Sequence, residues 1–180
     1  MNFLIYILML FVIFCFVFIW YISSFNKFQD FIIRINEAEN NIDSILRKRF
    51  DLLSKASSII NTLIDKEDAL ESISKLRSQK LTNFELDRKL CEAINELNIY
   101  RNNIEDLGTN EAFIKIEIGL NESEIEITAF RKYYNDIITD YNKAIKTFPS
   151  LIVAKTCKYK ERTYFDGKDM FDNIINDFKL

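Results

Sequence analysis

The chain has 180 residues and a net charge of −3, with no histidine, three glycines and one proline. A sheet of many strands needs turn residues, so this composition favours long helices. The lack of histidine removes the commonest general base and metal ligand. Charges of both signs are interspersed, which excludes a general electrostatic attraction to nucleic acid.

The first predicted element is an unbroken apolar run, Phe3–Ile22, of twenty residues without charge, glycine or proline. A helix of that length rises about 30 Å, which is the hydrocarbon thickness of a bilayer. Trp20 and Tyr21 stand at its downstream end, and aromatic rings prefer the headgroup level. We predict a transmembrane anchor over residues 1–25, with the lipid bilayer as the partner of Phe3–Ile22, and one helical domain over residues 26–180.

The flanks of this run favour an uncleaved anchor over the alternative of a signal peptide. No Lys or Arg precedes the run, and no small-x-small cleavage site follows it. On the downstream side, Lys27, Arg34 and the cluster Arg47-Lys48-Arg49 place the large C-terminal part in the cytoplasm by the positive-inside rule. Acidic neighbours weaken this bias, and a long domain can cross a membrane regardless of charge.

Apolar residues recur every three to four positions from Phe28 to Leu76, which predicts one long amphipathic helix, and no proline interrupts it. The stretch Asp65-Lys66-Glu67-Asp68 lacks an apolar contact and is typical of a frayed or kinked turn. We interpret this stretch as a solvated face, because it lacks the glycine and the alternating ligands of a calcium loop.

Two further helices follow. Thr82 or Asn83 is expected to cap a second helix that weakens after Tyr100 and stops near Gly108. Thr109 or Asn110 is expected to cap a third helix that Pro149 ends, and a last short helix is predicted over residues 171–178. The expected fold is all-α: an N-terminal transmembrane helix, a long antiparallel three-helix bundle packed up–down–up, and a short helical C-terminal tail.

Polar residues interrupt the apolar stripes at Arg49, Glu124 and Arg131. Buried ions are costly unless they are paired, because desolvation costs several kcal/mol per ion. We therefore expect Arg49 to meet a carboxylate of the third helix, with Glu124 as the first choice and Glu117 as the second. Whether Arg49 pairs with Glu124 is a question that the sequence leaves to the structure.

Several motifs, taken together in this order, resemble the signatures of the LemA family. The family has an Ile-Asp pair before a Leu-basic-Arg-Arg-x-Asp-Leu run, two later Tyr-Asn pairs, a Phe-Pro-x-Leu-Ile-Ala segment, and a closing Tyr-Phe. The matching segments here are Ile42-Asp43, Leu46–Leu53, Arg131–Asn135, Tyr141-Asn142, Phe148–Ala154 and Tyr164-Phe165. Ser54 departs from the family's usual proline. The resemblance implies a bacterial single-span inner-membrane protein with a helical bundle and no established biochemical activity.

The leading functional hypothesis is an anchored scaffold that binds another membrane protein or itself. Phe25, Phe28 and Phe31, just past the anchor, are candidates for lateral association, with ordinary core packing as the alternative. We predict no enzyme and assign no catalytic, cofactor-binding or metal residues, because no nucleophile–base constellation exists. Cys91 and Cys157 suit buried apolar packing.

The alternative function is a lipid-surface binding module that uses the basic segments. These are Arg47-Lys48-Arg49 and the group formed by Lys155, Lys158, Lys160 and Arg162. The first lies on a predicted helix, so its three side chains point to different sides. Both segments are short and the remaining chain is acidic, so nucleic acid is not expected as a partner.

Overall fold

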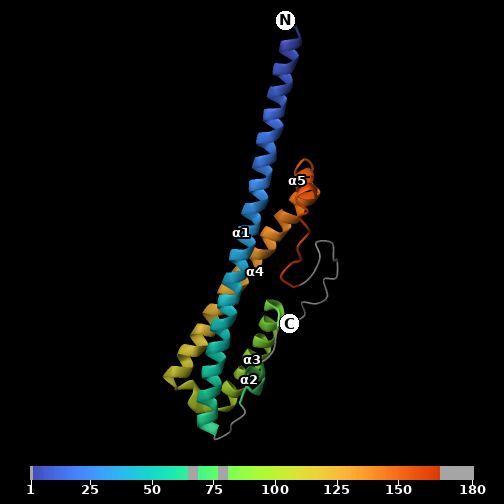
Figure 1. The fold of residues 1–180 in the computed structure, drawn as a ribbon. Coiled ribbons are helices and arrows are strands. Elements are labelled where there is room, and N and C mark those ends of the chain that lie inside the picture. The colour runs from blue at the N-terminus through green and yellow to red at the C-terminus, as the bar shows by residue number, and fades with distance from the viewer. Residues whose placement is uncertain (1, 65–68, 77–80, 167–180) are drawn as a thin grey trace. The chain divides into compact units, whose positions relative to one another are not determined.

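The computed structural model describes residues 2–64, 69–76 and 81–166. Every regular element in these ranges is a helix, so the all-α prediction is confirmed (Figure 1). The elements are α1 (Asn2–Ile64), α2 (Glu71–Leu76), α3 (Asn83–Asn103), the 3₁₀ helix η1 (Glu105–Gly108), α4 (Glu111–Lys146) and α5 (Ser150–Thr156). The helix predicted over residues 171–178 lies outside the described residues.

Contacts divide the chain into two compact units. In the described part, unit 1 contains residues 2–37 and 134–164, and unit 2 contains residues 38–133 together with Phe165 and Asp166. Helices α1 and α4 each supply residues to both units.

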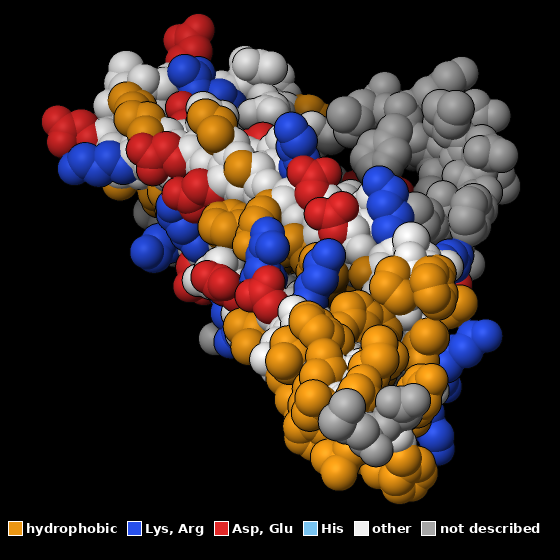
Figure 2. All heavy atoms as spheres, turned by 90° about the horizontal axis from the view of Figure 1, so that it is seen from above, with side chains coloured by type: hydrophobic (Ala, Val, Ile, Leu, Met, Phe, Trp, Pro, Cys, Tyr) orange, Lys and Arg blue, Asp and Glu red, His pale blue; other side chains and the backbone are white. Residues whose placement is uncertain are grey.

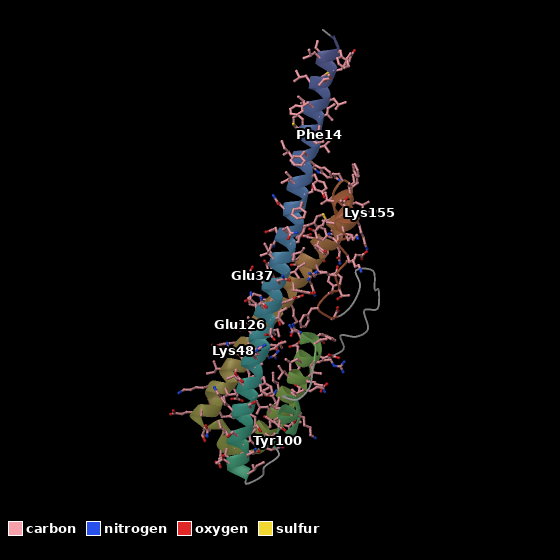
Figure 3. The ribbon with its side chains drawn as sticks, viewed as in Figure 1. Phe14, Glu37, Lys48, Tyr100, Glu126 and Lys155 are labelled. Atoms are coloured by element: carbon pink, nitrogen blue, oxygen red, sulfur yellow. The ribbon has the colours of Figure 1, made fainter. Side chains whose placement is uncertain are left out.

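The apolar start of α1 is long and apolar enough to cross a membrane, a property that signal sequences share. No other described element covers it: Phe3 is 77% exposed and Phe16 is 71% exposed. Phe14, labelled in Figure 3, stands out from this bare segment. Figure 2 looks onto the N-terminal end and shows hydrophobic side chains gathered there. Water alone would disfavour such a surface, because exposed apolar area is free-energetically costly.

The core of unit 1 begins two helical turns beyond this segment. Phe28 and Phe31 are buried, and both rings meet Tyr141 of α4 edge-on at centroid distances of 6.1 and 6.2 Å. Phe25, by contrast, is 36% exposed. Core packing, the alternative to lateral association, therefore holds for Phe28 and Phe31.

Unit 2 packs α1, α3 and α4 around a shared apolar core. Helix α4 runs antiparallel to α1, because the order of their contacts is reversed: Lys48 pairs with Glu126, and a Cβ on Gly119 would lie 3.1 Å from Leu52 Cδ1. Lys48 and Glu126 are both labelled in Figure 3. The fully buried apolar side chains of this core include Ile42, Leu46, Leu53, Ile60, Leu90, Leu107, Phe113 and Ile127.

Helix α3 is also antiparallel to α4. The contacts that show this are Asp87 with Arg131 and Arg101 with Glu117. Since α1 and α3 each oppose α4, they run parallel to each other, and the expected up–down–up order is corrected. The short α2 lies between α1 and α3 in the chain, so the path reverses twice where the sequence pattern suggested one reversal.

The first helix ends at Ile64 instead of continuing to Leu76. Leu70 adopts a positive φ of 56°, a conformation that a helix excludes. The turn is tied back to α1, since Ser57 donates to the Ala69 carbonyl and Asn61 Oδ1 accepts from the Ala69 N–H at 2.9 Å. Asp65–Asp68, expected to form a frayed turn, lie outside the described residues.

The predicted caps of the later helices are confirmed. Thr82 forms a capping box with Glu85, and its two hydrogen bonds lower the pKa of the Glu85 carboxyl. Asn110 Oδ1 accepts from the Phe113 N–H at 3.0 Å at the start of α4. Helix α4 ends at Lys146, three residues before Pro149.

Candidate functional site: a ring of charges and a tethered strap

Arg49 lies in the middle of the apolar stripe of α1. The preceding and following turns contribute Leu46 and Leu53, and both are completely buried, which brings the guanidinium into the core with only 1% exposure. A guanidinium stays protonated in proteins, so its burial requires acceptors from the neighbouring helices.

Four side chains of unit 2 form a closed ring of alternating charge, the charge ring. Arg49 Nη1 donates to Asp87 Oδ1 at 2.9 Å, and Arg131 Nη1 donates to Asp87 Oδ2 at 3.1 Å. Arg49 Nη2 also donates to Glu124 Oε2, and Arg131 Nη2 lies 3.4 Å from Glu124 Oε1. The ring therefore links α1, α3 and α4 through charge-assisted bonds, which are stronger than neutral ones.

The predicted pairing of Arg49 with Glu124 is confirmed, whereas Glu117, the second choice, pairs with Arg101 at 3.3 Å. Asp87 is the partner that sequence reasoning missed. A signal was present, because Asp87, Leu90, Ala93 and Leu97 follow helical spacing and form the buried face of α3.

Burial decides the electrostatics of the ring. Desolvation raises the pKa of the Asp87 carboxyl, and the charges of Arg131 and Arg49 oppose that rise. Burial also raises the pKa of the nearby Cys91 thiol, whose sulfur lies 4.0 Å from Arg49 Nη2. A raised pKa disfavours the thiolate, which is the nucleophilic form. Because its ion pairs join α1, α3 and α4, the ring can fix the register of these three helices.

A second polar arrangement lies in unit 1, where residues 158–164 form an extended strap along α4. The strap begins at Lys158, which has a positive φ of 57°. The Tyr159 N–H donates to the Ala154 carbonyl at 2.9 Å and closes the turn after α5. This extended backbone has no strand partner among the described residues. Its N–H and C=O groups therefore need hydrogen-bond partners from side chains.

Asn142 of α4 supplies those side-chain groups. Its Nδ2 donates to the Arg162 carbonyl at 2.7 Å, and its Oδ1 accepts from the Arg162 N–H at 3.0 Å. Asn142 is 1% exposed, so both bonds are shielded from water. One amide side chain thus satisfies both polar groups of one strap residue.

Tyrosines complete the attachment of the strap. Tyr141 donates to the Lys160 carbonyl at 3.0 Å, and Tyr134 donates to the Thr163 carbonyl at 3.4 Å. Tyr159 connects the strap to α1, since the centroid of its ring lies 4.9 Å from the ring centroid of Phe28. Burial raises the pKa of the Tyr141 phenol, which keeps the donor protonated. Three of the four residues of the two Tyr-Asn pairs, Tyr134, Tyr141 and Asn142, therefore bind the strap.

The two basic segments differ in what holds them. In the first, Arg47 pairs with Asp43 at 2.8 Å, Lys48 pairs with Glu126 at 3.5 Å, and Arg49 is buried in the charge ring. In the second, Lys155, Lys158 and Lys160 are all exposed. The second segment thus presents three exposed lysines, whereas the exposed Arg47 and Lys48 of the first segment are each paired with a carboxylate.

Among residues 2–64, 69–76 and 81–166, no group of three or more His, Cys, Asp and Glu side chains could hold a metal ion. All three cysteines are free, and Cys157 Sγ lies 3.7 Å from the Tyr21 hydroxyl.

Comparison with known proteins gives one family. The model of the LemA family matches residues 38–174, which is most of the chain. The match includes the charge ring and the strap. No curated protein matches the chain.

Proposed function

This chain belongs to the LemA family, and we propose from that premise that it is a single-span membrane protein whose helical part is a scaffold. The scaffold binds another membrane protein or a second copy of the chain at the bacterial inner membrane. The proposal gives it no chemical step, no cofactor and no nucleic-acid partner.

The observation that carries the proposal is the bare apolar start of α1. Leu10 is 71% exposed and Phe14 is 63% exposed, and their neighbours along the run are similar. A segment of this length would be unstable in water and matches the hydrocarbon thickness of a bilayer. The same helix continues without interruption to Phe28, which packs in the core of unit 1, so anchor and packed unit share one backbone.

The polar interior supports a structural role for the helical part. The charge ring uses both carboxylate groups to neutralise two guanidiniums, and guanidiniums stay protonated at physiological pH. The Asn142 side chain that holds the strap likewise has both of its polar atoms hydrogen-bonded to backbone groups. What remains for function is the surface of the helices, which suits recognition of another protein.

The proposed orientation places the bundle in the cytoplasm. The two N-terminal residues carry no Lys or Arg, whereas Lys27 and Arg34 follow the apolar run. Positive residues close to a membrane-spanning segment are retained on the cytoplasmic side. If this orientation is right, a cysteine introduced near the N-terminus lies on the outer side of the membrane. An impermeant thiol reagent added to intact cells is then expected to label it.

Alkaline carbonate extraction of membranes tests the anchor. The wild-type chain is expected in the pellet, and a variant with Leu10→Arg and Phe14→Arg is expected in the supernatant, since an arginine at the centre of a span costs about 3 kcal/mol on the insertion scale. The control is Leu10→Ala with Phe14→Ala, which removes bulk without adding charge and should remain in the pellet. Extraction of the wild-type chain would refute the anchor.

Cross-linking in intact membranes tests the scaffold. A discrete species heavier than the 21.4 kDa monomer is expected with the wild-type chain and not with the arginine variant. Coexpression of two differently tagged copies then separates self-association from binding to a different protein. Recovery of monomer alone, with the anchor intact, would reject the scaffold and leave the membrane location standing.

A further inference from the structure

Helix α5 has an outer face that the rest of unit 1 leaves uncovered. Phe148, in the turn just before the helix, is 73% exposed, and Ile152 on the helix is 48% exposed. The inner face is filled, since Val153 is 0% exposed and Ala154 is 1% exposed. The helix is therefore docked on unit 1 by one side and shows apolar side chains on the other.

The position of α5 along α1 is fixed by contacts within unit 1. Ser150, at the start of α5, and Lys27 line the same hollow, and Cys157, at its end, lies 3.7 Å from the Tyr21 hydroxyl. Helix α5 thus lies beside residues 21–27 of α1, as Figure 1 shows for the orange helix next to the blue one. Tyr21 and Lys27 are six residue steps apart along α1. This separation corresponds to about 9 Å, which is close to the thickness of one headgroup layer.

Positive charge accompanies this apolar face. Residues 143–160 contain five lysines and no acidic residue: Lys143, Lys146, Lys155, Lys158 and Lys160. Lys155 lies on α5 (Figure 3), and Lys158 follows the helix directly; both are exposed. Apolar side chains together with lysines at one level are the composition of an interfacial membrane helix.

We propose that α5 is a second membrane contact of this chain: Phe148 and Ile152 enter the headgroup layer beside the anchor, and Lys155 and Lys158 bind anionic phospholipid headgroups. The inference rests on the proposed anchor, because Phe3–Ile22 defines the level at which α5 lies. It assigns a ligand to the exposed Lys155 and Lys158: the phosphate group of an anionic lipid. It also explains why Phe148 and Ile152 are exposed at this end of unit 1.

Tryptophan fluorescence of the full chain in vesicles tests the depth of α5. The chain has one tryptophan, Trp20, so Trp20→Phe with Ile152→Trp gives a single reporter on α5. The matched control is Trp20→Phe with Ile125→Trp, because Ile125 is an even more exposed isoleucine, at 74%, on α4 in unit 2. The vesicles contain phosphatidylcholine and phosphatidylglycerol, with lipids brominated near the headgroup end of their chains as quenchers.

The Ile152→Trp reporter is expected to be blue-shifted and quenched, and the Ile125→Trp control to resemble a water-exposed indole. Equal emission from the two reporters, quenched or unquenched, would overturn the inference, because α5 would then have no special depth. The wild-type chain, in which Trp20 is the single tryptophan, is measured separately as the standard for the anchor. If Trp20 is quenched while the Ile152→Trp reporter is not, only the α5 contact fails; if Trp20 is unquenched, the proposed anchor itself fails.

A charge-reversal pair tests the headgroup contact. Lys155→Glu with Lys158→Glu is expected to reduce quenching of the Ile152→Trp reporter at least about twofold in vesicles with phosphatidylglycerol, since each lysine near an anionic surface contributes measurably to attraction. In vesicles of phosphatidylcholine alone the same pair should change little. The control pair is Lys115→Glu with Lys132→Glu, two exposed lysines of unit 2. Equal effects of the two pairs, or no effect of the first, would reject lipid binding by these lysines.

Discussion

Removal of Asp87 is predicted to be the most damaging single change in the charge ring. The Asp87 side chain is 5% exposed and that of Arg49 is 1% exposed, so Asp87→Ala leaves a guanidinium in the core with Glu124 as its remaining carboxylate. Loss of one partner from a buried ion pair costs about 3–5 kcal/mol. Glu124→Ala should cost about 1 kcal/mol or less, because the Glu124 side chain is 50% exposed and water can replace it.

Hydrogen exchange of the α3 amides, measured by mass spectrometry on the full chain in nanodiscs, is the assay. When exchange proceeds through cooperative opening, its rate follows the opening equilibrium. The expected loss for Asp87→Ala corresponds to exchange faster by about two to four orders of magnitude, against about fivefold for Glu124→Ala. The double variant Arg49→Met with Asp87→Leu removes both buried charges and should recover most of the protection, because an apolar pair avoids the desolvation penalty.

The prediction depends on the difference in exposure between the Asp87 and Glu124 carboxylates. If Asp87→Ala and Glu124→Ala accelerate exchange equally, exposure does not decide the energetics of this ring. If the Arg49→Met, Asp87→Leu double variant is as unstable as Asp87→Ala alone, an uncompensated charge is not the cause of the damage. Either result would refute the argument.

Three smaller predictions concern other elements. Asn142→Ala should release the strap at a cost of about 1–3 kcal/mol, detected as faster tryptic cleavage at residues 158–162 with little change in far-UV circular dichroism. Gly119→Ala should be close to neutral in urea unfolding, because the gain in helix propensity offsets a tight contact, whereas Gly119→Leu should destabilise by about 1–3 kcal/mol. The Glu85 carboxyl should titrate below its ordinary value of 4.5 by carbon NMR and return toward it in Thr82→Ala. Since its pKa is lowered in the folded state, the stability from Glu85 is present above pH 4.5 and is lost as the pH falls through the folded pKa.

Periodicity and local capping signals were sufficient to predict α1, α3 and α4 and the starts of α3 and α4, whereas the end of α1 at Ile64 and the short helices α2 and α5 were not predicted. The apolar stripes of α1 and α4 are long, and Thr82 with Glu85 is a short-range signal that depends on neighbouring residues only. The direction of α3 was not predictable in this way. It depends on the turn at Leu70 and the short α2, which make the chain reverse twice, and a positive φ at a leucine leaves no recognisable sequence signal.

The charge ring was half predicted for a similar reason. Arg49 and Glu124 stood out because each interrupts an apolar stripe, so their pairing followed from the cost of a buried ion. Asp87 was missed although its helical spacing from Leu90, Ala93 and Leu97 places it on the buried face, because α3 carries many other polar residues. The burial of Phe28 depends on Tyr159, which is distant in the sequence and is positioned by the strap, so periodicity could not reveal that contact.

The side chain of Asn142 acts as a mimic of a peptide group. It offers one donor and one acceptor at the spacing that a neighbouring strand would provide, and so an extended segment can lie against a helix without a sheet. Aspartate lacks the donor, and glutamine places the same amide one methylene further away. A position can therefore accept a single residue type for reasons of backbone geometry, in a protein to which no catalytic step is assigned.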